Sequence, residues 1–153
     1  MTLFSIMKWL HILSAIAALG SNLTYNAWLG LARGQPDSLV FALKGIRSID
    51  NKIANRGYGA LLVTGVIMVL VADFPWSAPW LLTSIILYVA TSVLGIAVYS
   101  PSLRRQIELA ESEGPESAAY QAAAQSSTRL GIVVTLIVVV IVFLMVVKPN
   151  LWG

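Results

Sequence analysis

The residue best suited to chemistry in this sequence is its single histidine. His11 lies inside a long apolar segment, where an ionisable side chain is by default a candidate functional group. In such surroundings the imidazole should be neutral, which is the form that ligates metals. Haem iron in cytochromes is held by two histidines or by a histidine and a methionine. With one histidine in the chain, a haem would need a methionine as its second ligand.

Met68 is the methionine that best suits that role. It lies on the second apolar segment at a predicted depth near that of His11, and Gly65 one turn away would leave room for a flat macrocycle. Lys8 lies one turn nearer the membrane surface than His11, within reach of a haem propionate. We therefore predict a haem between the first two spans, with His11 and Met68 as iron ligands and Lys8 beside a propionate.

A plainer interpretation assigns the same residues to helix packing. His11 would hydrogen-bond a neighbouring helix through Tyr88 or Ser92, and Met68 would fill space. Polar and small residues recur on one face of the first and third spans, which is typical of helix contacts in membranes and also of a lined cavity. A channel is less favoured, because none of the predicted spans carries an acidic residue at depth.

The remaining composition excludes several kinds of site. The chain has no cysteine, so disulfides, thiolate metal sites and cysteine nucleophiles are excluded. It has no glycine-rich phosphate loop, and Glu108, Glu111, Glu113 and Glu116 fall on a solvated connection. The net charge of +3 comes without a concentrated basic patch, so we expect no nucleic-acid partner.

Four apolar segments must position these residues. Hydrophobic residues make up 58% of the chain and charged residues only 11%, too few to cover a water-soluble domain. A membrane-spanning helix needs about 20 mostly apolar residues, and the four segments lack the alternation of barrel strands. We predict one all-α membrane domain in the lipid bilayer, an antiparallel four-helix bundle with spans at about residues 4–31, 54–74, 80–99 and 130–147.

The basic residues predict the orientation of this bundle. Every Lys and Arg except Lys8 and Lys148 falls in the connections 32–53 and 100–129 or directly beside them. By the positive-inside rule, both connections are cytoplasmic and both termini lie outside. We expect residues 41–49 to form a short helix lying on the inner membrane surface, and Ser100 with Pro101 to begin a second loop helix.

The chain resembles a family of bacterial four-helix proteins known as predicted integral membrane proteins of unknown function. The resemblance covers essentially the whole chain and is carried by residues 8–14, 48–58, 99–107 and 146–153. It implies the bacterial cytoplasmic membrane as the location and implies no activity.

A more distant resemblance is to the bacterial membrane protoporphyrinogen oxidase that binds haem b, and to copper-resistance protein D. It rests on the pair Leu10-His11 in the first helix. The resemblance implies that His11 ligates haem iron and, less directly, that Met68 is the other ligand. The second helix lacks the Arg-Leu-Tyr start and the internal proline of the oxidase. These departures weigh against porphyrinogen oxidation and against the alignment of Met68.

Two functions therefore remain open at the level of the sequence. The first is a small membrane protein that binds haem b between its first two helices for electron transfer or redox chemistry. The alternative is a cofactor-free accessory subunit or small-molecule carrier, packed into a larger membrane complex or a homo-oligomer. Neither interpretation assigns an enzymatic reaction or a substrate.

Overall fold

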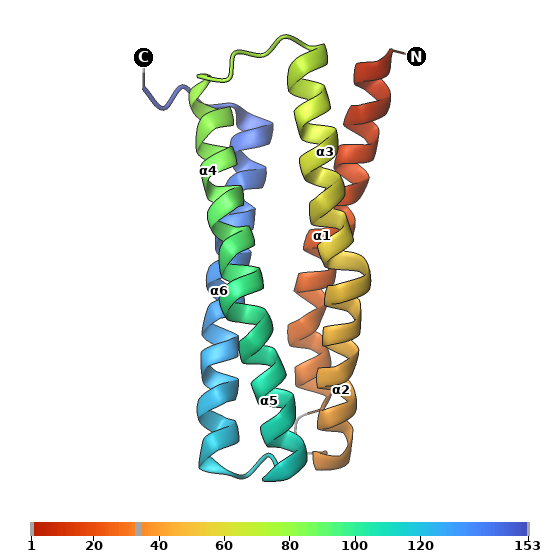
Figure 1. The fold of residues 1–153 in the computed structure, drawn as a ribbon, viewed down its shortest axis with the longest axis vertical. Coiled ribbons are helices and arrows are strands. Elements are labelled where there is room, and N and C mark those ends of the chain that lie inside the picture. The colour runs from red at the N-terminus through yellow and green to blue at the C-terminus, as the bar shows by residue number, and fades with distance from the viewer. Residues whose placement is uncertain (1, 33–34, 153) are drawn as a thin grey trace.

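The protein is an elongated bundle of helices with both termini at the same end (Figure 1). The structure is a computed structural model that describes residues 2–32 and 35–152. We call the end with the termini the terminal end, and the opposite end, which bears most of the Lys and Arg residues, the basic end. The elements are α1 (Leu3–Ala32), α2 (Pro36–Ile49), the π-helical turn η1 (Asp50–Ala54), α3 (Asn55–Val71), α4 (Pro79–Leu94), the π-helical turn η2 (Gly95–Tyr99), α5 (Ser100–Ser112) and α6 (Ala118–Val147). The predicted all-α fold is confirmed.

Four continuous helices are long and apolar enough to cross a membrane. They run over Leu3–Ala32, Ser38–Val71, Pro79–Ser112 and Ala118–Val147, and they contain the four predicted spans almost completely. Large apolar side chains such as Ile16, Leu70, Ile86 and Val146 are exposed on their outer faces. Such a surface would be unfavourable in water and suits contact with lipid tails.

The connections at the basic end differ from the prediction. The expected surface helix and loop at 32–53 are instead α2 and η1, which run on into α3 as one helix. Likewise α4 passes through η2 into α5, so the predicted loop 100–129 reduces to a short turn between Ser112 and Ala118. A new helix was expected at Pro101 because proline has no N–H to donate. The π-turn before Pro101 takes up the change of hydrogen-bond register, and the helix continues.

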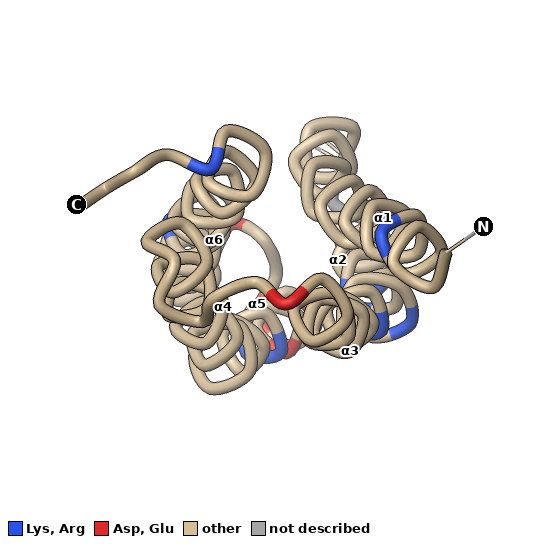
Figure 2. The backbone as a smooth tube through the Cα atoms, turned by 90° about the horizontal axis from the view of Figure 1, so that it is seen from above, with Lys and Arg blue, Asp and Glu red and all other residues tan. Residues whose placement is uncertain are grey.

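The spans associate as two pairs. Seen along the bundle axis, α1 and α3 lie on one side, and α4 and α6 lie on the other (Figure 2). No Cα atoms of α3 and α4 come within 8 Å of each other in the described part of the chain. The backbones of the two pairs approach each other instead where α1 meets α6 and where α2 meets α5.

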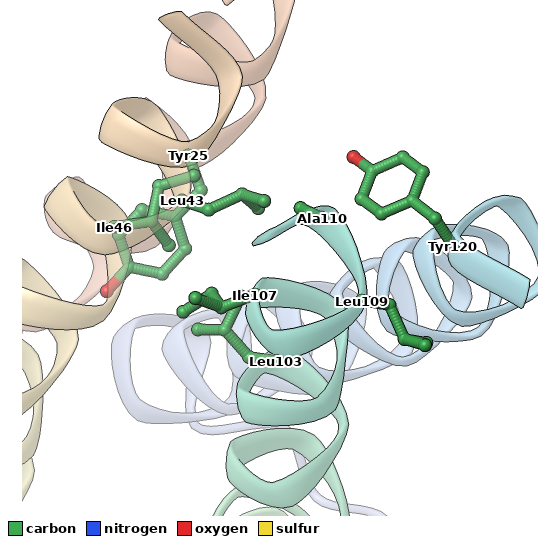
Figure 3. Close-up of a cluster of buried hydrophobic side chains, with 8 residues drawn as sticks. All are labelled: Tyr25, Leu43, Ile46, Leu103, Ile107, Leu109, Ala110 and Tyr120. Carbon is green, nitrogen blue, oxygen red and sulfur yellow. The ribbon is translucent and has the colours of Figure 1, made fainter. Parts of the chain in front are cut away.

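At the basic end the pairs meet in a buried apolar cluster. Leu103 and Ile107 of α5 point toward Tyr25 of α1 and toward Leu43 and Ile46 of α2 (Figure 3). Farther along α5, Ala110 lies beside the ring of Tyr120 from α6. The cluster thus joins α1 and α2 to α5 and α6, and Leu43 and Ile46 are among its most deeply buried side chains.

At the terminal end an aromatic group closes the bundle. The ring of Phe74, just beyond α3, lies edge-on to Phe4 of α1 at 6.4 Å and to Trp80 of α4 at 5.7 Å between centroids. The ammonium of Lys148, which caps α6, lies 5.0 Å from the Phe74 centroid and 5.1 Å from the Trp80 centroid. The ammonium is attracted by the negative quadrupole of the aromatic faces. Because the four residues come from or adjoin different helices, these contacts link all four spans.

The helices α1 and α3 pack closely enough to need a glycine. A Cβ atom added at Gly57 would lie 3.1 Å from Ala18 Cβ and 3.2 Å from the carbonyl oxygen of Ser14. By contrast, a Cβ at Gly59 would meet nothing within 4 Å. Small residues at such a contact let membrane helices approach and gain packing energy.

We expect Gly57→Val to destabilise the protein by about 1–3 kcal/mol, because the added side chain must force α1 and α3 apart. Gly59→Val is the matched control, since it makes the same chemical change on the same helix in open space. The comparison is thermal unfolding of the detergent-purified proteins followed by circular dichroism. Equal unfolding temperatures for the two variants would contradict the close contact.

Candidate functional site

His11 makes a hydrogen bond across the α1–α3 contact. Its Nδ1 lies 3.0 Å from Oγ1 of Thr64. The Thr64 hydroxyl lies 2.6 Å from the carbonyl oxygen of Ala60 and donates its one proton there. The hydroxyl must therefore accept from His11, so we assign the proton to Nδ1. This tautomer leaves Nε2 with a free lone pair, which is how a metal-ligating histidine is commonly arranged.

The imidazole of His11 also lies directly against the backbone of α3. A Cβ at Gly65 would approach its Cε1 atom to 3.2 Å. The partner of His11 is thus Thr64, and the expected bond to Tyr88 or Ser92 was wrong. Those two hydroxyls donate elsewhere, to the carbonyl oxygens of Tyr58 at 2.9 Å and of Tyr88 at 2.8 Å respectively.

The other two predicted ligand-site residues lie toward the terminal end from His11. Met68 is half-buried and follows Thr64 by one turn, about 6 Å along the axis of α3. Lys8 is exposed and precedes His11 by one turn of α1. The structure therefore brings His11 to the face of α3 that also carries Met68, at the level of Thr64 and Gly65.

This packing does not fit a haem between α1 and α3. A porphyrin between His11 and Met68 needs a layer of free space on each side of its ring, about 3.5 Å to the nearest carbon atoms. The imidazole already contacts the Gly65 position, and Gly57 holds the same two helices together farther along. A metal ion held directly by side chains is a separate matter, and the described residues contain no group of three or more His, Asp or Glu placed to hold one.

Several polar side chains of the stripes form hydrogen bonds within their own helix. Their hydroxyl groups donate to carbonyl oxygens one turn earlier in the same helix, at 2.7–2.8 Å. The side chains concerned are Ser14, Ser21, Ser84 and Thr91. Because these donors are satisfied within their own helix, they leave little unpaired polarity to line a cavity.

A second polar site, which the sequence analysis missed, centres on Asp50. Tyr25 of α1 donates its hydroxyl proton to Oδ1 of Asp50 over 3.1 Å. One level farther along, Asn22 donates to the hydroxyl of Tyr58 over 2.6 Å, and Tyr88 of α4 donates to the carbonyl oxygen of Tyr58. Tyr99 also packs, partly buried, against the apolar cluster that contains Tyr25. We call Asp50, Tyr25, Tyr58 and Tyr99 the Asp50 cluster.

Asp50 is a half-buried carboxylate without a basic partner among the described residues. Among the described residues, the ion pair that the structure contains joins Lys44 to Glu111 and does not involve Asp50. The position of the site along the bundle axis is given by Tyr99, because the Tyr99 ring would lie 3.7 Å from a Cβ atom added at Gly131. Gly131 stands where the long apolar run of α6 begins, so the Asp50 cluster lies at the basic end of the apolar layer.

The sequence analysis missed Asp50 because it assigned the residue to a loop. The predicted span began at about residue 54, whereas the continuous helix in the structure runs over Ser38–Val71 and includes Asp50. A usable signal was present, since Ile46, Asp50, Ala54 and Gly57 follow one another at helical spacing. The polar residues around position 50 made the helix look interrupted in the sequence.

The assigned tautomer of His11 is directly measurable, because the chain has one histidine and ¹⁵N-histidine labelling gives a single imidazole. We expect NMR shifts of a protonated Nδ1 and an unprotonated Nε2, with the pattern changing in Thr64→Val, which removes the acceptor. Ser92→Ala, whose hydroxyl bonds within its own helix, should leave the pattern unchanged. A proton on Nε2 in the wild type would contradict the Thr64 bond.

Comparison with known proteins adds one finding to this geometry. The profile of a family described as "predicted integral membrane protein" (DUF2269) matches residues 5–149. No curated protein matches the chain. No solved structure matches it either.

Proposed function

Because the chain belongs to this family of integral membrane proteins, we propose that it is a small-molecule carrier that works without a cofactor and takes an organic cation at Asp50. The observation that supports the proposal is the half-buried carboxylate of Asp50, held by Tyr25 and lacking a basic partner in the described chain. Burying a charge without a counter-charge is unfavourable. A bound cation would remove that penalty.

The surroundings of Asp50 favour an organic cation over a metal ion. A metal ion needs several charged or carbonyl oxygen ligands around it, and Asp50 is the one carboxylate of its cluster. Its hydrogen-bond donor is instead the aromatic side chain of Tyr25, and Tyr58 and Tyr99 belong to the same cluster. Rings beside a carboxylate suit a cation whose charge is spread over an apolar body.

The arrangement of the bundle suits access to this site. The spans pair as α1 with α3 and α4 with α6, and the backbones of α3 and α4 stay apart. Tyr88 bridges that separation through one hydrogen bond, which a small movement could open. By the positive-inside rule the basic end faces the cytoplasm, so Asp50 would exchange its ligand on the cytoplasmic side.

A binding measurement with tetraphenylphosphonium, a monovalent organic cation, tests this proposal. We expect saturable binding to the detergent-purified protein, weakening as the pH falls because protons compete for the Asp50 carboxylate. Asp50→Asn should lower the affinity at least about tenfold, since it removes the charge and keeps the shape. In proteoliposomes loaded with tetraethylammonium, an organic cation that crosses a bare bilayer far more slowly, the same substitution should abolish the release that depends on the protein.

Asp73→Asn is the matched control for this experiment. It makes the same change at an exposed position with a φ of 52°, a backbone conformation that asparagine tolerates. Binding by this variant should equal that of the wild type. Equal affinities for Asp50→Asn and the wild type would show that the carboxylate is not the binding group.

The competing proposal is a haem b protein with His11 and Met68 as ligands and Lys8 beside a propionate. The free Nε2 of His11 is the observation in its favour, and the close contact of α1 and α3 weighs against it. We expect a protein expressed with added haem precursor to show no Soret band before or after dithionite. A Soret band that disappears in His11→Ala would overturn this expectation and require α1 and α3 to separate.

A role as an accessory subunit is distinguished from a carrier by purification. In the accessory role, the exposed apolar faces would contact a partner helix or another copy of the chain in addition to lipid. Stoichiometric partner proteins, together with an absence of cation binding, would favour the accessory role.

A further inference from the structure

A groove along η2 and α5 combines apolar and basic residues in a fixed order. It has a volume of about 260 Å³ and is lined by Ile96, Ser100, Pro101, Arg104, Arg105 and Glu108. Ile96 is 74% exposed at its apolar end. The two arginines lie about 12–13 Å farther along the helix axis, at its polar end. From this arrangement we infer that the groove binds the phosphate headgroup of an anionic phospholipid.

The depth of the groove matches the position of a lipid headgroup. Tyr99 lies beside Gly131, where the apolar run of α6 begins. Ile96 is therefore on the apolar side of that level, and Arg104 and Arg105 are on the polar side. A phospholipid in the adjoining leaflet has the same order, with acyl chains first and phosphate beyond them.

The two arginines are free to bind an anion. Both are exposed, and within the described chain neither forms an ion pair. The spacing of Arg104 and Glu108 favours a salt bridge, but the structure pairs Lys44 with Glu111 instead. Guanidinium groups present planar, paired donors that match the oxygens of a phosphate.

The charge of the groove favours one class of headgroup. Two arginines and one glutamate leave a net charge of +1, which matches a phosphodiester with a single negative charge. The Glu108 carboxylate can also accept hydrogen bonds from headgroup hydroxyls. We therefore assign the site to phosphatidylglycerol rather than to a zwitterionic lipid or a free phosphate ion.

Native mass spectrometry of the purified full-length protein tests the assignment. The protein is titrated with phosphatidylglycerol or phosphatidylethanolamine of identical acyl chains, and the retained lipid is counted. We expect the wild type to retain phosphatidylglycerol in preference. Arg104→Gln combined with Arg105→Gln should lower its affinity for that lipid on the order of tenfold. An excess of inorganic phosphate should not displace the lipid.

Arg56→Gln combined with Arg129→Gln is the matched control, because both residues are exposed at the basic end and lie outside the groove. This variant should change the affinity less than twofold. If both double variants lost affinity for phosphatidylglycerol equally, the loss would reflect net charge alone and would contradict a specific site in the groove. Unchanged retention without Arg104 and Arg105, equal retention of the two lipids, or displacement by phosphate would overturn it as well.

Discussion

The close approach of α1 to α3 is the constraint on which the candidate sites depend. Lipid tails are as apolar as leucine, so membrane helices are held by packing and hydrogen bonds more than by the hydrophobic effect. Gly57 permits the contact, two hydrogen bonds cross it from His11 and Asn22, and a third joins Tyr25 of α1 to Asp50 of η1. The same contact orients the imidazole, places Tyr58 and supplies Asp50 with its tyrosine donor.

The two π-helical turns allow each long helix to serve two neighbours. On an uninterrupted α-helix, Leu43, Ile46, Gly57 and Thr64 would fall on one stripe. The extra residue in η1 rotates α3 by about 100° relative to α2. Leu43 and Ile46 therefore point into the cluster shared with α5, whereas Gly57 and Thr64 face α1. The turn also places Asp50 at the level where these two interfaces meet.

Features that depend on composition and length could be predicted from the sequence, and features that depend on helix contacts could not. The four spans could be predicted because a helix that crosses a bilayer needs a long apolar run. His11 was identified by its chemistry, but its partner Thr64 depends on how α1 and α3 rotate against each other. Asp50 was missed because a span predicted from hydropathy ends where charged residues appear, although the helix itself can continue past that point.

The contacts that hold the two ends of the bundle together leave Asp50 and two arginines of α5 without an ion-pair partner among the described residues. Phe4, Phe74, Trp80 and Lys148 fasten the terminal end, and the buried apolar cluster fastens the basic end. Beside that cluster, Asp50 accepts a hydrogen bond from Tyr25 of α1, while Arg104 and Arg105 of α5 are exposed. Since no ion pair in the described chain joins these groups, neither charge satisfies the other. The negative charge stays available to a cation inside the bundle, and the positive charges to an anion at the lipid boundary.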